Sequence, residues 1–215
     1  MNKYEYQMNP RLCTLLLLLT IGVMMAMGQS TDISSRTDAI YVEGKTVKPG
    51  SQIVLSVQMK NEAVSVRGFQ FDLFLPDRMS FVRDENDKCK VTLSTSRTTG
   101  EAGNYFFVAN VRSDGALRVL CNAWDGTPFT GTSGEVCTVS VAVDSGAEEG
   151  DCAIAFSNII FTGPDAQRYP VDDVTCLFTI STEEDDILLY GDVNHDGTIS
   201  IADVMILLRY IIGQP

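Results

Sequence analysis

Hydrophobic residues occupy every second position in several runs between residues 37 and 182. Ile53, Leu55, Val57 and Met59 alternate with polar side chains, and a period of two is typical of a strand with one buried face. The same alternation recurs in runs 69–75, 117–123, 137–143, 152–156 and 175–180. Turn signals such as Lys48-Pro49-Gly50 separate the runs. The pattern predicts an all-β sandwich of about nine short strands over residues 37–182.

Two segments outside this region follow other patterns. Lys3 and Arg11 precede an apolar run at 15–26, which ends on the small-residue sequence Ala26-Met27-Gly28. This arrangement predicts a secretory signal peptide over residues 1–28, cleaved near Gly28, because the run is short for a membrane span. We therefore expect a mature chain that is exported, either released or periplasmic, and not inserted in the membrane.

Near the C-terminus, residues 192–203 have the spacing of a twelve-residue calcium loop. The expected ligands are Asp192, Asn194, Asp196, the backbone carbonyl of Thr198, and Asp203. Gly197 allows the sharp turn at the sixth position. Oxygen donors at this spacing favour Ca²⁺. The loop departs from the EF-hand pattern because position 12 is Asp and no apolar helix precedes it.

This segment resembles the first half of a type I dockerin, which uses a calcium loop followed by a helix. The motif runs from Gly191 to Leu207, and the sequence ends at Pro215 after one such repeat, so we expect a single calcium-binding repeat over 191–215. The resemblance implies that Asp203 is a bidentate ligand. It also implies partner-reading positions at Ile201, Ala202, Leu208 and Arg209.

The final helix, expected over 200–212, is apolar on most of its circumference. Only Asp203 and Arg209 carry charge in it. Soluble monomers avoid exposing such a surface. We therefore expect the helix to dock either on the sandwich of its own chain or on another molecule.

The sandwich region is similar to cohesin domains. The resemblance rests on the segment from Val66 to Pro76, followed by Met79-x-Phe81, and on the segment from Gly134 to Asn158. It implies a jelly-roll β-sandwich related to carbohydrate-binding modules, which recognises a partner protein through one sheet face. An acidic linker at 183–190 would join this domain to the calcium repeat.

Net charge and cysteine content bear on the expected partners and on disulfide bonding. The net charge is −12 and would become −13 without residues 1–28, so nucleic acid and anionic membranes are not expected partners. Five cysteines would remain after cleavage, an odd number without a C-x-x-C spacing. Several of them fall in register with apolar neighbours, which favours buried thiols over a disulfide framework.

Catalysis has little support, because His195 is the only histidine and lies within the calcium loop. We expect a non-catalytic, exported scaffold or adhesion protein. It would use calcium-dependent cohesin–dockerin-type binding, in an assembly related to extracellular polysaccharide. Its partner would carry a cohesin or a dockerin, and a second copy of this chain is one candidate. The alternative is a carbohydrate-binding module that attaches to polysaccharide, with Trp124 as the best single stacking residue.

Overall fold

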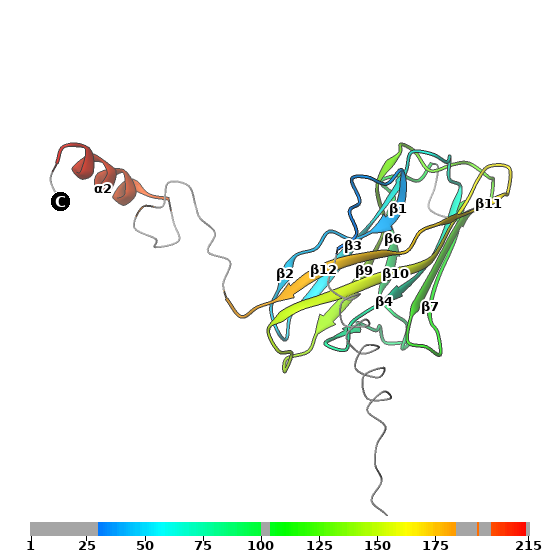
Figure 1. Ribbon diagram of the computed structural model, residues 1–215, viewed down its shortest axis with the longest axis horizontal. Coiled ribbons are helices and arrows are strands. Elements are labelled where there is room, and N and C mark those ends of the chain that lie inside the picture. The colour runs from blue at the N-terminus through cyan, green and yellow to red at the C-terminus, as the bar shows by residue number, and fades with distance from the viewer. Residues whose placement is uncertain (1–29, 100–103, 184–192, 194–198, 214–215) are drawn as a thin grey trace, which may run out of the picture. The chain divides into compact units, whose positions relative to one another are not determined.

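A computed structural model describes residues 30–99, 104–183, 193 and 199–213 of the chain (Figure 1). The chain divides into two compact units, residues 1–182 and residues 183–215. The predicted signal peptide lies outside the described residues. No helix among the described residues is long and apolar enough to cross a membrane.

The first unit contains a five-stranded antiparallel sheet (Figure 1). Its order is β1 (Asp38–Tyr41), β3 (Gln52–Asn61), β9 (Ser133–Val143) and β5 (Met79–Phe81), and β6 (Val91–Leu93) also pairs with β9. The long pairing of β3 with β9 forms the centre of this sheet, with one register shift between Val57 and Gln58.

The second sheet has seven strands and carries the candidate site. Its order is β2 (Thr46–Val47), β12 (Val174–Ile180), β10 (Gly150–Thr162), β4 (Gly68–Phe74), β8 (Leu117–Ala123) and β7 (Tyr105–Val111), and β11 (Arg168–Val171) pairs with the end of β10. All neighbours are antiparallel except β2 and β12, which run parallel.

The two sheets enclose a core built from the alternating apolar positions. Phe69, Phe71 and Leu73 of β4 are fully buried, and Phe71 packs edge-on against Phe156 of β10 with ring centroids 5.5 Å apart. The predicted all-β sandwich is confirmed. The described residues contain twelve strands rather than about nine. The difference comes from elements such as β2, which has only two residues and is too short to show an alternating pattern.

One buried side chain in the sandwich is a cation. Arg97 is 4% exposed and lies in a polar loop after β6. Its guanidinium donates to the carbonyls of Met59, Thr130 and Gly131 at 2.7–3.0 Å and to Oδ1 of Asn61 at 2.6 Å. These contacts tie the loop to β3 and to the segment before β9.

In the second unit, α2 (Ile201–Ile211) begins with a capping box. Ser200 Oγ accepts a hydrogen bond from the backbone N of Ala202 at 3.1 Å, and Asp203 Oδ2 accepts one from the backbone N of Ser200 at 2.7 Å. This pairing satisfies amides of the first turn that have no partner within the helix. Asp203 is the one buried residue of α2.

The five described cysteines are free thiols. Burial raises the pKa of Cys121 to about 12 and also raises the pKa of Cys137 and Cys176.

Since the thiolate is the reactive form, we expect these three buried cysteines to resist a thiol reagent in the native protein. The half-buried Cys89 and Cys152 should react first, and all five should react in denaturant. Mass spectrometry after timed alkylation measures the order. Early labelling of Cys137 would contradict this core packing.

Candidate interaction surface

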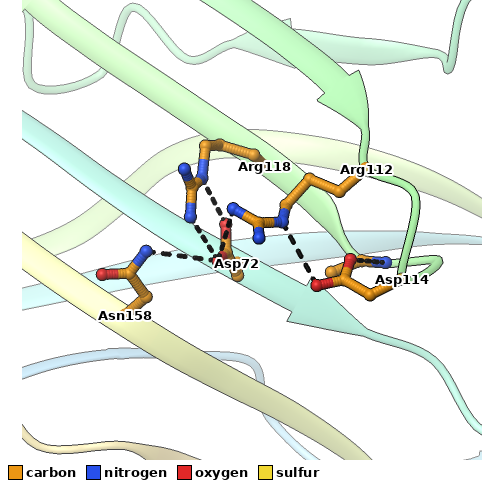
Figure 2. Close-up of polar contacts among 6 residues, drawn as sticks. Asp72, Arg112, Asp114, Arg118 and Asn158 are labelled. Carbon is orange, nitrogen blue, oxygen red and sulfur yellow. Dashed lines mark hydrogen bonds and ion pairs between the residues drawn. The ribbon is translucent and has the colours of Figure 1, made fainter.

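The outer face of the seven-stranded sheet carries a cluster of charged side chains (Figure 2). Asp72 of β4 lies directly opposite Arg118 of β8 in the strand register. The Arg118 guanidinium donates two hydrogen bonds to the Asp72 carboxylate, at 2.7 and 2.6 Å. Such a bidentate pair fixes the geometry of both side chains.

Two further residues contact Asp72. The side-chain amide of Asn158 donates to Oδ2 of Asp72 at 3.3 Å, and Nη1 of Arg112 lies 3.8 Å from the same oxygen (Figure 2). Asn158 has a φ of 49° and falls where the register of β10 with β4 shifts between Ser157 and Ile160. Asparagine tolerates this backbone conformation better than most residues. The irregularity therefore brings the amide to Asp72.

The environment of Asp72 favours its ionised form. Burial alone would raise the pKa of this carboxyl, since the side chain is only 7% exposed. Hydrogen bonds from Arg118 and Asn158 and the charges of Arg118 and Arg112 outweigh the burial, and the pKa of Asp72 lies below its ordinary value of 3.8. The cluster is thus a fixed, charged feature of this face at neutral pH.

A hollow lies towards each end of the same face. The Trp124 hollow has a volume of about 610 Å³ and lies over β7, β8, β4 and the end of β10. The Ala155 hollow has a volume of about 670 Å³ and is lined by residues of β4, β10 and β12, among them Phe74, Cys152 and Ala155. The face therefore combines two partly apolar hollows with an ordered ionic centre.

The outer face of the five-stranded sheet differs in chemistry. Its central strands alternate buried aliphatic residues with small or polar outward side chains, such as Ser56 and Gln58 on β3 and Thr138 and Ser140 on β9. Val54 is its one large hydrophobic residue that is more than half exposed. The two large, partly apolar hollows and the ordered charges of the Asp72 cluster, which serve specific recognition, lie on the seven-stranded sheet.

The sequence-predicted site residues lie in both units. Trp124, the predicted stacking residue, follows β8 and is 69% exposed at the Trp124 hollow. Asp192, Asn194, Asp196 and Thr198, the predicted calcium ligands, lie outside the described residues. The predicted partner-reading residues Ile201, Ala202, Leu208 and Arg209 all lie on α2 and are exposed.

The fifth predicted ligand, Asp203, lies within the part of the chain that the structure describes. Its side chain is 1% exposed, and Oδ1 accepts a hydrogen bond from the backbone N of Val193 at 2.8 Å. Val193 is the second residue of the predicted calcium loop, so the twelfth position lies against the start of the loop. That closure is what a twelve-residue cation loop requires. Among the described residues, no group of three or more His, Cys, Asp or Glu side chains lies close enough together to hold a metal ion.

The Asp72 cluster was not predicted from the sequence. Asp72 and Arg118 each fall on the polar side of an alternating run, which was the available signal. Their opposition depends on the pairing of β4 with β8, and the place of Asn158 depends on the register shift in β10. The alternating pattern of a single strand predicts neither of these features.

This chain is similar to known proteins in its structure. No family model matches the sequence, and a search of curated proteins finds no match. A non-cellulosomal cohesin from the hyperthermophilic archaeon Archaeoglobus fulgidus superposes with a TM-score of 0.54 at 18% identity, over 69% of this chain and 94% of that one.

Two bacterial structures agree with this result. The seventh ScaB type I cohesin from Pseudobacteroides cellulosolvens gives a TM-score of 0.54 at 14% identity, over 67% of this chain and 92% of that one. A chain of the type I cohesin–dockerin complex Coh-OlpA-Doc918 from Clostridium thermocellum gives 0.53 at 16% identity, over 68% of this chain and the whole of that one. The β-sandwich of this chain therefore has a cohesin-like fold, followed by a C-terminal helix.

Proposed function

We propose that this protein is a non-catalytic protein-interaction module that docks a partner on the outer face of its seven-stranded sheet. The contrast between the two outer faces carries this proposal. One face holds the ordered Asp72 cluster between two partly apolar hollows, whereas the other presents mainly small and polar side chains. Specific interfaces combine apolar contact with fixed polar groups in this way.

The cohesin-like fold supports a proposal for the class of partner. Several solved structures with this fold are cohesins in complexes with dockerins. We infer a dockerin-bearing partner for this chain, and a second copy of the chain is one candidate. The proposal includes export of the protein and a place in an extracellular assembly related to polysaccharide, in keeping with the N-terminal sequence pattern.

Two alanines offer a matched test of the docking face. Ala155 lies on the outer side of β10 in the seven-stranded sheet, and Ala142 lies on the outer side of β9 in the five-stranded sheet. We expect Ala155→Arg to weaken partner binding at least tenfold, because a long charged side chain would fill the Ala155 hollow. Ala142→Arg should bind as the wild type does.

The measurement is affinity capture from the secreted fraction of the source organism with the three proteins as bait, followed by titration of the captured partner. The captured partner should carry a dockerin repeat. Equal loss of binding in both variants, with both folded by circular dichroism, would contradict docking on this face. Capture of a partner without such a repeat would contradict the partner class.

We further propose that the C-terminal segment binds Ca²⁺ through Asp192, Asn194, Asp196, the Thr198 carbonyl and Asp203. The contact between Asp203 and Val193 supports this assignment, because it brings the twelfth position to the start of the loop. A bound dication would offset the repulsion among these carboxylates and order the segment. The bound ion would thereby position α2.

Calcium titration by calorimetry tests this assignment. A single extracellular loop should bind with a dissociation constant on the order of micromolar to millimolar. Asp196→Ala should weaken binding more than tenfold, since it removes one ligand charge. Asp186→Ala, which removes an acidic residue outside the loop, should bind calcium like the wild type. Equal heats for the wild type and Asp196→Ala, or a stronger response to zinc, would contradict the assignment.

A further inference from the structure

The Trp124 hollow presents an exposed aromatic pair. Trp124 is 69% exposed and Phe106 of β7 is 42% exposed. Their ring centroids are 5.6 Å apart, and the rings meet edge to face at 74°. The edge contact with Phe106 supports one side of the indole and leaves much of Trp124 open to solvent. A rigid, open aromatic ring beside a recess is suited to stack on a ligand.

The charge of this hollow is opposite to that of the chain. The protein has a net charge of −12, yet its lining includes Arg67 and Arg168 and no Asp or Glu. No ion pair within the described part of the chain involves either arginine. Two arginines without carboxylates in an acidic protein indicate an anionic ligand.

Arg67 gives a second indication of a ligand. Its Nε is buried and has no hydrogen-bond partner among the described residues, which is rare for a buried polar atom. A Cβ at position 126 would lie 3.2 Å from Nη1 of Arg67, so Gly126, at φ +79°, leaves room for the guanidinium beside Trp124. The arginine is therefore held at the hollow with hydrogen-bonding capacity still to be filled.

The rest of the lining supplies neutral polar groups. The side chains of Gln70, Asn122 and Thr162 line the hollow and carry amide and hydroxyl groups. Gly68 lies opposite Asn122 in the strand register, and a Cβ there would clash with the Asn122 side chain and lie 2.8 Å from the carbonyl oxygen of Cys121. The missing side chain at position 68 thus lets Asn122 occupy this place on the sheet.

We propose that the Trp124 hollow binds a carboxylated saccharide, such as a run of uronic acid residues. The apolar C–H face of a sugar ring would stack on Trp124, and its carboxylate would pair with Arg67 and Arg168. The ring hydroxyls would bond to Gln70, Asn122 and Thr162. A volume of about 610 Å³ is within the usual range for small-ligand sites, roughly 300–1,000 Å³. This activity goes beyond partner docking and needs no dockerin.

An acidic peptide is the competing ligand, because its carboxylates would also pair with the arginines. The saccharide is favoured by the composition of the lining. Amide and hydroxyl groups next to an open indole suit a ring with several hydroxyls. A peptide of acidic residues has no flat apolar ring face to stack on the indole.

The chain's one tryptophan makes a direct experiment available, since its fluorescence reports on this hollow alone. The purified protein is titrated with a linear galacturonic acid tetramer, a neutral galactose tetramer of equal length and a tetraglutamate peptide. We expect the acidic sugar to give a saturable change in fluorescence, and the neutral sugar to bind at least tenfold more weakly. Binding of the acidic sugar should weaken when the salt concentration rises from 20 to 300 mM, because salt screens its charge.

Single substitutions test which side chains bind the acidic tetramer. Arg67→Gln and Arg168→Gln should each weaken binding of the acidic tetramer about tenfold, and Trp124→Ala, followed by calorimetry, should abolish it. Arg83→Gln, which alters an exposed arginine on another part of the surface, should leave it unchanged. The idea is overturned by an absent response to the acidic tetramer, by an equal response to the neutral tetramer, by tighter binding of the peptide, or by equal losses in Arg83→Gln and Arg67→Gln.

Discussion

Replacing Arg97 with methionine is expected to lower the free energy of unfolding by about 3–5 kcal/mol, on the basis that each buried polar group left unsatisfied costs about 1–3 kcal/mol. Methionine preserves much of the side-chain volume but donates no hydrogen bond. Two buried acceptors, the carbonyl of Met59 and Oδ1 of Asn61, would lose the donor that the structure provides, as would the half-buried carbonyls of Thr130 and Gly131. Burial lowers the pKa of Arg97, but an arginine remains protonated at neutral pH.

Urea unfolding followed by tryptophan fluorescence measures this loss. Arg83→Met is the matched control, because Arg83 is 44% exposed and its ion pair with Asp87 lies in solvent. Arg83→Met should lower the free energy of unfolding by less than about 1 kcal/mol, because exposed ion pairs contribute little to stability. If Arg97→Met unfolds within 1 kcal/mol of the wild type, the four hydrogen bonds do not stabilise the sandwich as described. Arg97→Lys should fall between the two, since one ammonium cannot reach all four acceptors.

The second large effect is expected from Asp72→Asn, which should destabilise the sandwich by about 2–3 kcal/mol, less than the roughly 3–5 kcal/mol of a fully buried broken pair. The substitution keeps the shape of the side chain but removes the charge that Arg118 binds at two oxygens. Arg118 is 33% exposed, so water compensates part of the loss. Asp87→Asn, which alters an exposed pair, is the control.

Acid titration gives an independent check on Asp72. Because its folded pKa is depressed below 3.8, its contribution to stability is complete above the unfolded pKa and is lost as the pH falls through the folded pKa. The stability difference between the wild type and Asp72→Asn should therefore be constant near neutrality and shrink below about pH 4. A difference that grows on acidification would contradict a depressed pKa.

The alternating runs predicted the sheet faces because burial imposes a period of two on the sequence. Phe69, Phe71 and Leu73 point inward as their spacing indicates, and Gln70 and Asp72 lie on the other side of β4. Arg97 could not be predicted in this way. It lies in a run of Ser and Thr residues, and its burial results from carbonyls of two distant segments, at Met59 and at Thr130 and Gly131, that converge on it.

The candidate surfaces were predicted only where the chemistry is local in sequence. A calcium loop carries its ligands within twelve residues, and an exposed tryptophan next to a turn can be recognised alone. The Trp124 hollow takes Arg67, Trp124 and Arg168 from three separate segments. Strand pairing brings those segments together, and each arginine in isolation resembles an ordinary solvated side chain.

The parallel pairing of β2 with β12 has a mechanical consequence. β12 leads into the C-terminal unit, so tension transmitted through that unit reaches the sandwich at the end of this strand. β12 is hydrogen-bonded along its length to β10 and at its last residues to β2 on the other side. A pull along β12 loads both ladders in shear, and many hydrogen bonds must break together before the strand slides.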